Sequence, residues 1–279
     1  MKNVKNNAQL SSSIKKNKLK NFDGGLRKKK IYKKSYRNKP LISIITVVFN
    51  DKNNIKKTIL NVTNQIYSNF EYIVIDGGST DGTAEIIKKY ENKIDYWLSE
   101  KDNGIYDAMN KGIDLARGDW VNFMNSGDIF YSRLVLKSLF AHQKYKNVQI
   151  IYGNHQVIYP RGNLKIVKPG LLKNLWKGTQ FCQQSSFVTI NCLKKIKFNT
   201  KKKISADFQF FYTAWKNNIK FKFVDINVVK FKSGGISDLN RVQSVLERWD
   251  VIEKTMKNNI FYSLLIIKEI LKTLVKRFV

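Results

Sequence analysis

The sequence predicts an α/β fold built on a mostly parallel β-sheet flanked by helices. Apolar runs rich in β-branched residues alternate with helical stretches between residues 41 and 124. These runs are almost unbroken, as expected for strands that are covered on both faces. Polar and glycine-rich segments follow several of the runs, at the strand ends where parallel sheets bind ligands. Strands that alternate with helices in this way form parallel sheets.

The predicted elements follow one another in a regular order. Predicted strands cover residues 41–49, 70–75, 96–98 and 120–124, and helices follow the first three, ending near residues 64, 90 and 116. Beyond about residue 150 the alternation loosens. Strand candidates there are 149–152, 221–224 and 228–231, and a helix is predicted near 208–215. We expect this second half to be a smaller mixed region laid on the first, where it shapes the substrate site.

The composition indicates a folded protein with anionic partners. Of the 279 residues, 43% are hydrophobic, which is enough for a sizeable core and excludes a disordered or fibrous protein. Lys and Arg number 51 against 21 Asp and Glu, a formal net charge of +30. Nucleic acid, phosphorylated metabolites and an acidic membrane face are the partners that this charge favours. Cys182 and Cys192 form no disulfide framework or zinc motif, which favours a reducing cytosol.

The amino-terminal residues 1–39 differ from the rest of the chain. They contain 14 Lys or Arg and one acid, Asp23, and no apolar run long enough for a signal-peptide core. Such a segment buries too little apolar area to offset its chain entropy, so we expect a disordered polybasic arm. Its expected partner is anionic lipid.

Residues 241–279 are expected to form a basic amphipathic helical segment. Its apolar residues recur at steps of three and four, namely Ile260, Leu264, Ile267, Leu271, Leu274 and Phe278. Basic residues lie among them, namely Lys257, Lys268, Lys272, Lys276 and Arg277. The pattern predicts a helix on an acidic membrane surface or a helix packed on the protein's own core or a partner. Lys268 and Glu269 interrupt it before it reaches the length of a membrane span.

Three successive strand ends carry polar or glycine residues directly after a buried apolar run. They read Phe49-Asn50, Asp76-Gly77-Gly78 and Ser126-Gly127-Asp128. Each alone is typical of a turn, but together they predict a nucleotide-sized cleft with acids at its floor. In so basic a chain, acids at a cleft indicate Mg²⁺ or Mn²⁺ bridging a diphosphate. The glycine-rich loops of ATPases and dinucleotide-binding dehydrogenases are absent from the sequence.

Four ordered motifs carry a family resemblance. They are SIITVVFN at 43–50, VIDGGSTDGT at 74–83, SEKDNGIYDAMNKG at 99–112 and GDWVNFMNSGD at 118–128. Residues 40–240 resemble the family 2 glycosyltransferases, most nearly the bacterial branch that builds O-antigen, capsule or other surface polysaccharide. The resemblance implies a GT-A nucleotide-diphospho-sugar transferase fold with a smaller acceptor-side region. It also implies inverting transfer of a sugar from a nucleotide-diphosphate donor with Mg²⁺ or Mn²⁺.

The resemblance also implies the donor and metal sites. Its donor-binding positions correspond to Thr46, Val47, Phe49, Asp76, Asp81, Asp102, Ser126 and Gly127. Family members often carry two consecutive acids after the second strand, whereas Gly77 is the second residue here, so Asp76 and Asp81 both remain candidates for the nucleoside. Asp128 is the one acid in the family's metal motif and is the expected metal ligand.

The resemblance implies that Asp207 is the catalytic base, because it matches the family's acid at the start of a helix in the second half. A helix amino terminus favours an ionised carboxylate, which can accept a proton from an acceptor hydroxyl. The alternative interpretation is an ordinary helix cap. Gln183 and Gln184 stand where the branch shows a His-Gln pair and are expected to bind substrate. Lys232 belongs to a late loop expected to close over the diphosphate.

The expected partners are a nucleotide-diphosphate sugar and a saccharide or lipid-linked saccharide acceptor. The two basic ends of the chain favour a cytoplasmic protein held peripherally on the inner face of the plasma membrane. One alternative is a non-catalytic glycosyltransferase-like subunit, because the metal motif has lost acids. Another is a nucleic-acid-binding protein, suggested by the charge of +30. No nucleic-acid module is recognisable, so nucleic acid is not an expected partner.

Overall fold

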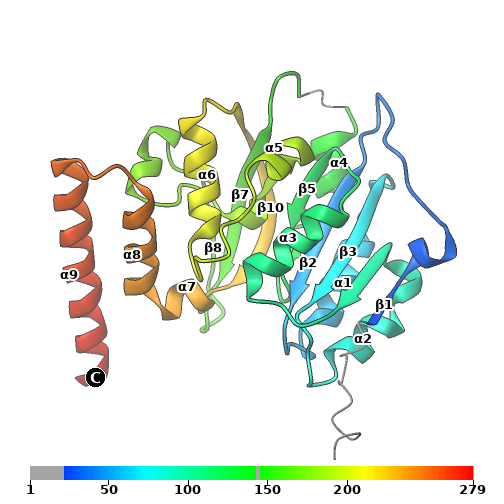
Figure 1. Ribbon diagram of the computed structural model, residues 1–279, viewed down its shortest axis with the longest axis horizontal. Coiled ribbons are helices and arrows are strands. Elements are labelled where there is room, and N and C mark those ends of the chain that lie inside the picture. Colours follow the sequence, from blue (N-terminus) through cyan, green and yellow to red (C-terminus); the bar gives the residue numbers. More distant parts are fainter. Residues whose placement is uncertain (1–21, 143–144, 279) are drawn as a thin grey trace, which may run out of the picture.

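The computed structural model describes residues 22–142 and 145–278. Within them, one sheet runs in the strand order β1-β4-β3-β2-β5-β9-β7-β10-β6, and β8 pairs with β7 beside this path (Figure 1). The strands are β1 (Phe22–Gly24), β2 (Ile42–Val48), β3 (Phe70–Asp76), β4 (Tyr96–Ser99), β5 (Trp120–Phe123), β6 (Ile129–Phe130), β7 (Ile150–Ile158), β8 (Leu164–Val167), β9 (Ser186–Thr189) and β10 (Phe221–Lys232). The α-helices are α1 (Ile55–Thr63), α2 (Thr83–Lys89), α3 (Ile105–Leu115), α4 (Val135–Phe140), α5 (Ile190–Lys195), α6 (Ala206–Lys216), α7 (Ile236–Leu239), α8 (Arg241–Val251) and α9 (Met256–Phe278). Short 3₁₀ helices are η1 (Leu26–Lys29), η2 (Glu91–Lys93), η3 (Leu172–Lys177) and η4 (Gln183–Ser185).

The strands β4, β3, β2 and β5 pair in parallel, as the sequence predicts. β2 pairs in parallel with both β3 and β5, and β3 pairs in parallel with β4. Every residue of β2 and β3 is buried, which explains their unbroken apolar character. The predicted strands and helices of residues 41–124 are confirmed in this order.

Helices cover both faces of the sheet and give two cores. On one face, α1, α2 and α4 pack on the strands, and β2 contributes Ile42, Ile44 and Val48. On the other face, α3, α5 and α6 pack on the strands, and β2 contributes Ile45 and Val47. Successive residues of a strand point to opposite faces, so one short strand supplies both cores.

The second half of the sheet is mixed. β9 is inserted antiparallel between β5 and β7, while β7 and β10 are parallel to each other. The two strand candidates at 221–224 and 228–231 are parts of the single strand β10, whose register against β7 shifts between Phe223 and Val229. This irregularity breaks the local pattern, which explains why the sequence suggests two strands.

The carboxyl-terminal helices form the end of the molecule farthest from β1. In Figure 1, α9 lies beside α8, and α8 lies next to α6. A third core joins them, with Phe208 and Tyr212 of α6, Val245 of α8 and Tyr262 of α9. The predicted carboxyl-terminal helix is confirmed by α9. Within the described residues, no helix is both long enough and apolar enough to cross a membrane.

The expectation of a disordered arm over residues 1–39 was wrong for residues 22–39. β1 pairs antiparallel with β4 at one edge of the sheet, and η1 follows it. Arg27 of η1 is 9% exposed and forms an ion pair with Glu71 of β3, 2.7 Å between Nη2 and Oε2. A buried partner 44 residues away explains the order of this basic segment, and composition does not reveal such a partner. Residues 1–21 lie outside the described residues.

Candidate active site

A cleft of about 1440 Å³ lies at the carboxyl ends of the parallel strands. Residues that follow β2, β3, β4 and β5 line it, including 77–80, 99–106 and 125–126. Residues 200–204, directly before α6, also line it, together with Gln243 and Glu247 of α8. The cleft therefore joins the parallel half of the sheet to the carboxyl-terminal helices.

Asp76, the last residue of β3, is completely buried and holds the turn that follows. Its carboxylate accepts hydrogen bonds from the backbone N–H of Ser79 (3.0 Å), the hydroxyl of Ser79 and the hydroxyl of Ser99. Asp76 is not among the residues that line the cleft. Its carboxylate thus fixes the shape of the cleft floor from behind.

Asp102 presents its carboxylate at the position where a side chain on residue 77 would lie. A Cβ added to Gly77 would stand 2.5 Å from Asp102 Oδ2, so a side chain there would displace the Asp102 carboxylate. The backbone N–H of Gly104 donates to Asp102 Oδ1 at 2.9 Å and fixes the side chain. Burial raises the pKa of Asp102, and the nearby charge of Asp76 adds to this effect. Asp102 lines the cleft and supplies an acid next to Gly77, the position after Asp76.

Asp81 lies at the amino terminus of α2 and outside the cleft lining. Its carboxylate accepts hydrogen bonds from the backbone N–H (3.0 Å) and hydroxyl (2.6 Å) of Thr83 and from the backbone N–H of Lys52 (3.1 Å). The hydroxyl of Thr83 is the main reason that the pKa of Asp81 is lowered. Asp81 therefore ties α2 to the loop after β2.

The three predicted residues of the first strand end divide between core and cleft. Thr46 is buried, and its hydroxyl donates to the carbonyl of Met124 at 2.7 Å. Val47 and Phe49 line the cleft, and the Phe49 ring is 63% exposed. An exposed aromatic ring at a cleft offers a flat surface for a nucleoside base.

The loop 125–128 follows β5 and holds the expected metal ligand. Gln184 donates from Nε2 to Asp128 Oδ2 at 3.0 Å. Burial raises the pKa of Asp128 to about 7, and the bond from Gln184 opposes this effect. Ser126 lines the cleft and donates from its hydroxyl to Asp51 at 2.7 Å, whereas Gly127 and Asp128 are outside the lining.

Asn125 gives this loop a second oxygen. Its Oδ1 is buried, and none of the described residues donates a hydrogen bond to it. A carboxylate and an amide oxygen on one loop are the hard ligands that Mg²⁺ and Mn²⁺ accept. No cluster of three or more His, Cys, Asp or Glu side chains suited to a metal occurs in the described part of the chain. The residues present therefore fit a metal that takes its remaining ligands from substrate and water.

Asp207 lies in the first turn of α6, as predicted. The hydroxyl of Tyr106 from α3 is 3.2 Å from Asp207 Oδ1 and donates to the carbonyl of Ile204 at 2.6 Å. Tyr106 and Ile204 line the cleft, and the partly buried Asp207 lies directly behind them. Burial raises the pKa of Asp207, while the backbone N–H of Phe208 lowers it.

The loop 125–128 and the predicted base Asp207 both lie near the Cys182 side chain. The Cys182 thiol donates to Gln184 Oε1 at 2.7 Å, and the Gln184 amide in turn bonds to Asp128. Burial raises the pKa of Cys182, and the charges of both Asp128 and Asp207 raise it further. The fold thus brings Asp128 and Asp207, 79 positions apart in the chain, to within electrostatic reach of one thiol.

The remaining predicted residues lie away from the cleft lining. Gln183 is buried, and its amide is 3.6 Å from the Met109 sulfur in α3. Lys232 is exposed at the end of β10. Of the expected substrate-binding residues in this region, Gln184 is the one that contacts the metal loop.

Three residues of the site were not singled out from the sequence. Asp51 lines the cleft and contacts Ser126, and its position directly after a strand was a usable signal. Tyr106 stands within one of the quoted motifs, but its contact with Asp207 spans 101 positions. Glu247 has no local sequence signal, because only the packing of α8 brings it to the cleft.

Curated relatives of this chain are glycosyltransferases. An uncharacterized glycosyltransferase of Mycobacterium tuberculosis is 45% identical over 92 residues, which are 33% of this chain and 35% of that protein. The PGL/p-HBAD biosynthesis glycosyltransferase of Mycobacterium bovis is 27% identical over 206 residues, covering 71% of this chain and 80% of that protein. An uncharacterized glycosyltransferase of Methanocaldococcus jannaschii is 25% identical over 206 residues, covering 70% and 71%.

Solved structures share the fold at low identity. The S. aureus TarS 1–349 complex with UDP-GlcNAc has a TM-score of 0.60 and 19% identity, over 77% of this chain and 67% of that chain. The mannosyltransferase PcManGT of Pyrobaculum calidifontis, in complex with GDP-Man and Mn²⁺, has a TM-score of 0.61 and 15% identity, over 77% and 64%. These GT-A neighbours confirm the fold that the sequence predicts.

The model of glycosyl transferase family 2 matches residues 43–202. That range covers more than half of the 279 residues and contains the four motifs and the strand ends that form the cleft. The chain therefore belongs to glycosyl transferase family 2.

Proposed function

We propose that this protein transfers a sugar from a nucleotide-diphosphate donor to an acceptor hydroxyl, with inversion at the anomeric carbon. The observation that carries the proposal is one cleft that Asp102, Asn125 and Ser126 line, with Asp128 on the same loop as Asn125 and Asp207 in contact with Tyr106 of the lining. The donors bound by the neighbouring structures, UDP-GlcNAc and GDP-Man, support a nucleotide sugar as the ligand class.

The nucleoside is assigned to the side of the cleft formed after β2 and β3. Phe49 offers an exposed ring for the base, and Asp102 offers a carboxylate for a base or ribose N–H or O–H. Asp76 and Asp81 are both used in bonds to their own loops, so we assign them to shaping this side of the cleft.

The diphosphate is assigned to the loop 125–128. Asp128 and Asn125 Oδ1 would hold Mg²⁺ or Mn²⁺ there, and the bound ion would neutralise charge on the departing nucleoside diphosphate. Gln184 orients the Asp128 carboxylate through its amide N–H. Asp128, the proposed ligand, lies in the loop after β5, and Gln184, which orients it, lies in η4.

Asp207 is the proposed base. Its carboxylate accepts the proton of the acceptor hydroxyl as that oxygen forms a bond to the anomeric carbon, and the bond from this carbon to the diphosphate oxygen breaks. The nucleoside diphosphate leaves with the electron pair. The Tyr106 hydroxyl, 3.2 Å from Oδ1, keeps the carboxylate oriented between turnovers.

For the acceptor we propose a saccharide, and more specifically a lipid-linked saccharide in the synthesis of bacterial surface polysaccharide. Support for a membrane location comes from α9. Its outward face carries exposed Leu and Ile side chains at steps of three and four, namely Ile260, Leu264, Ile267, Leu271 and Leu274, between 44% and 62% exposed.

We propose that this face of α9 rests on anionic lipid at the inner face of the plasma membrane. Lys268 and Lys272 are exposed on the same helix, and the opposite face, with Tyr262 fully buried, packs on α8. Basic residues beside an exposed apolar stripe match an acidic membrane surface, into which the apolar side chains insert.

Replacing Leu264 and Leu271 together by Glu is expected to lower binding to phosphatidylserine-containing vesicles at least about tenfold. Each leucine contributes about 1.5–3 kcal/mol when it leaves water, and about 1.4 kcal/mol is a tenfold change. Cosedimentation with vesicles, with and without phosphatidylserine, measures the effect. The matched control is the double change of Leu164 and Ile166 in β8, also exposed, to Glu. Equal losses in both double variants would contradict a docking role for α9.

Titration against a panel of nucleotide sugars that includes UDP-GlcNAc and GDP-mannose tests the proposed function. One donor is expected to bind in a Mn²⁺-dependent way, and Asp128→Ala is expected to weaken that binding at least about tenfold, because the ion loses its one carboxylate ligand. Release of nucleoside diphosphate, with water as acceptor where no saccharide is supplied, reports turnover. Donor binding without any release would favour the non-catalytic subunit instead. Absence of donor binding together with salt-sensitive binding to nucleic acid would overturn the proposal.

A further inference from the structure

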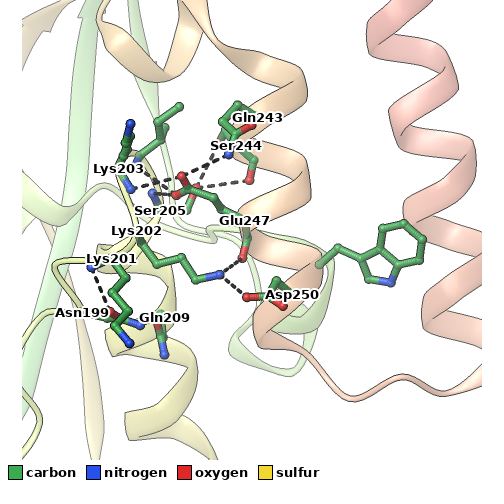
Figure 2. Close-up of polar contacts among 12 residues, drawn as sticks. Asn199, Lys201, Lys202, Lys203, Ser205, Gln209, Gln243, Ser244, Glu247 and Asp250 are labelled. Atoms are coloured by element: carbon green, nitrogen blue, oxygen red, sulfur yellow. Dashed lines mark hydrogen bonds and ion pairs between the residues drawn. The ribbon is translucent and has the colours of Figure 1, made fainter.

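Glu247 of α8 holds the backbone that leads into α6. It is 7% exposed, and its carboxylate accepts hydrogen bonds from three consecutive backbone N–H groups: Lys203 at 3.1 Å, Ile204 at 3.0 Å and Ser205 at 2.9 Å (Figure 2). Backbone donors before a helix have no partner within it, so they need one from elsewhere. Here an acid more than 40 positions away satisfies all three.

Other residues on α8 bind the same segment. Ser244 accepts a hydrogen bond from the Ser205 hydroxyl at its carbonyl oxygen, 3.2 Å away, and Asp250 forms an ion pair with Lys202 (Figure 2). Residues 244, 247 and 250 are spaced by three and therefore lie along one face of the helix. This face of α8 therefore binds residues 202–205 through hydrogen bonds and an ion pair.

Residues 202–205 set the positions of both Tyr106 and the proposed base Asp207. The carbonyl of Ile204 accepts the Tyr106 hydroxyl at 2.6 Å, and Asp207 follows three positions later in the first turn of α6. The N–H of Ile204 bonds to Glu247 while its carbonyl bonds to Tyr106. A single peptide segment thus links Glu247 to the Tyr106–Asp207 contact.

We propose that Glu247 is a positioning residue for transfer, which fixes residues 203–205 so that Asp207 and Tyr106 keep one arrangement beside the cleft. The inference rests on the proposed role of Asp207 as base. Glu247 lies beyond residue 202, where the match to the family model ends, so the carboxyl-terminal segment of this chain supplies it. Glu247 acts through the backbone and takes no proton itself.

Two substitutions test the inference, Glu247→Ala and the nearly isosteric Glu247→Gln. The alanine variant leaves three backbone donors without their acceptor and is expected to lower kcat for nucleoside-diphosphate release by about 10- to 100-fold, since a small misplacement of a catalytic group costs this much. KM for the donor is expected to stay near the wild-type value. The glutamine variant keeps one acceptor oxygen and is expected to lie between the alanine variant and wild type. The acid limb of the pH–rate profile is expected to move in both, because the surroundings of Asp207 change.

Val245→Ala is the matched control. Val245 is buried on the same helix, in the core shared with α9. Its apolar side chain forms no hydrogen bond with residues 203–205. It is expected to lower thermal stability while leaving the pH profile in place. Hydrogen exchange of the 203–205 amides is expected to accelerate in both Glu247 variants, at least about tenfold in Glu247→Ala, and not in Val245→Ala, which shows directly that these hydrogen bonds are lost.

The outcomes separate this inference from the proposed function. Loss of kcat, a moved acid limb and faster exchange in the Glu247 variants, with none of these in Val245→Ala, support the positioning role. If Asp207→Asn is inactive while Glu247→Ala matches Val245→Ala in kcat and pH profile, the positioning role fails and the base assignment stands. If Asp207→Asn keeps full turnover, the base assignment fails first, and the positioning role fails with it.

Discussion

Asp207→Asn is expected to lower turnover by about 10²- to 10⁴-fold, the usual contribution of a general base. An amide at this position cannot accept the proton of the acceptor hydroxyl, while it can keep the contact with the Tyr106 hydroxyl, 3.2 Å away. Donor binding is expected to persist, because Asp207 is assigned to the acceptor hydroxyl and not to the nucleoside or the diphosphate. Release of nucleoside diphosphate from the bound donor measures turnover, and titration measures binding.

The pH dependence gives the same prediction a second readout. Burial raises the pKa of Asp207 above its ordinary value of 3.8. Wild-type turnover needs the ionised form, so it is expected to fall as the pH falls through this raised pKa, with an acid limb above pH 3.8. The residual rate of Asp207→Asn is expected to lack this limb.

Stability is expected to move in the opposite direction from activity. A raised pKa in the folded state means that folding favours the protonated form, so the ionised carboxylate costs stability as the pH rises through that pKa. Asp207→Asn removes this cost at neutral pH and is expected to unfold at an equal or higher temperature. The control is Asp114→Asn, an exposed residue paired with Lys197. Near-wild-type turnover in Asp207→Asn would place the base on another residue.

Glu71→Ala is expected to lower the free energy of unfolding by about 3–5 kcal/mol, because it leaves a buried guanidinium without its partner. Glu71 is 2% exposed and accepts hydrogen bonds from Arg27 Nη2 at 2.7 Å, from the Ser43 hydroxyl and from the backbone N–H of Arg117 at 2.7 Å. One carboxylate therefore joins η1, β2 and the turn after α3 to β3. Chemical denaturation followed by far-ultraviolet circular dichroism measures the loss.

A surface ion pair provides the comparison for this prediction. Asp114 and Lys197 are 2.7 Å apart but 58% and 44% exposed. Exposed pairs contribute about 0–1 kcal/mol, so Asp114→Ala is expected to change the free energy of unfolding by no more than that. Similar losses in Glu71→Ala and Asp114→Ala would mean that the buried network does not hold residues 22–39 on the sheet.

In the loop 125–128, the sequence predicts the expected metal ligand, but only the structure shows the contacts around it. The sequence singles out Asp128 as the acid of the 125–128 loop, because the residue types and their place after a strand are local features. It does not reveal that Asn125 Oδ1 is buried without a hydrogen-bond donor among the described residues, or that Gln184 bonds to Asp128. Those facts depend on β5 and η4 being neighbours, which is a property of the packed sheet.

The donor side shows the same division. From the sequence, Asp76, Asp81 and Asp102 are all acids near the strand ends. The packing separates them: Asp76 is buried behind the turn, Asp81 binds the start of α2, and Asp102 covers Gly77 at the cleft. Glycine at position 77 is what makes room for Asp102, a relation between residues 25 positions apart.

The sequence by itself determined the family, the order of strands and helices in the first half, and the motifs at the strand ends. The family follows from the resemblance carried by the four motifs, and the elements follow from periodicity and from the residue types next to each strand. All of these are features of short stretches of chain. The tertiary structure alone decided that Phe22–Gly24 joins the sheet, that β10 is one strand, and that Glu247 binds the segment before Asp207. Each of these depends on contacts between segments that are distant in the sequence. No local pattern records such contacts, because a buried ion pair or cap needs only that its two partners meet in space.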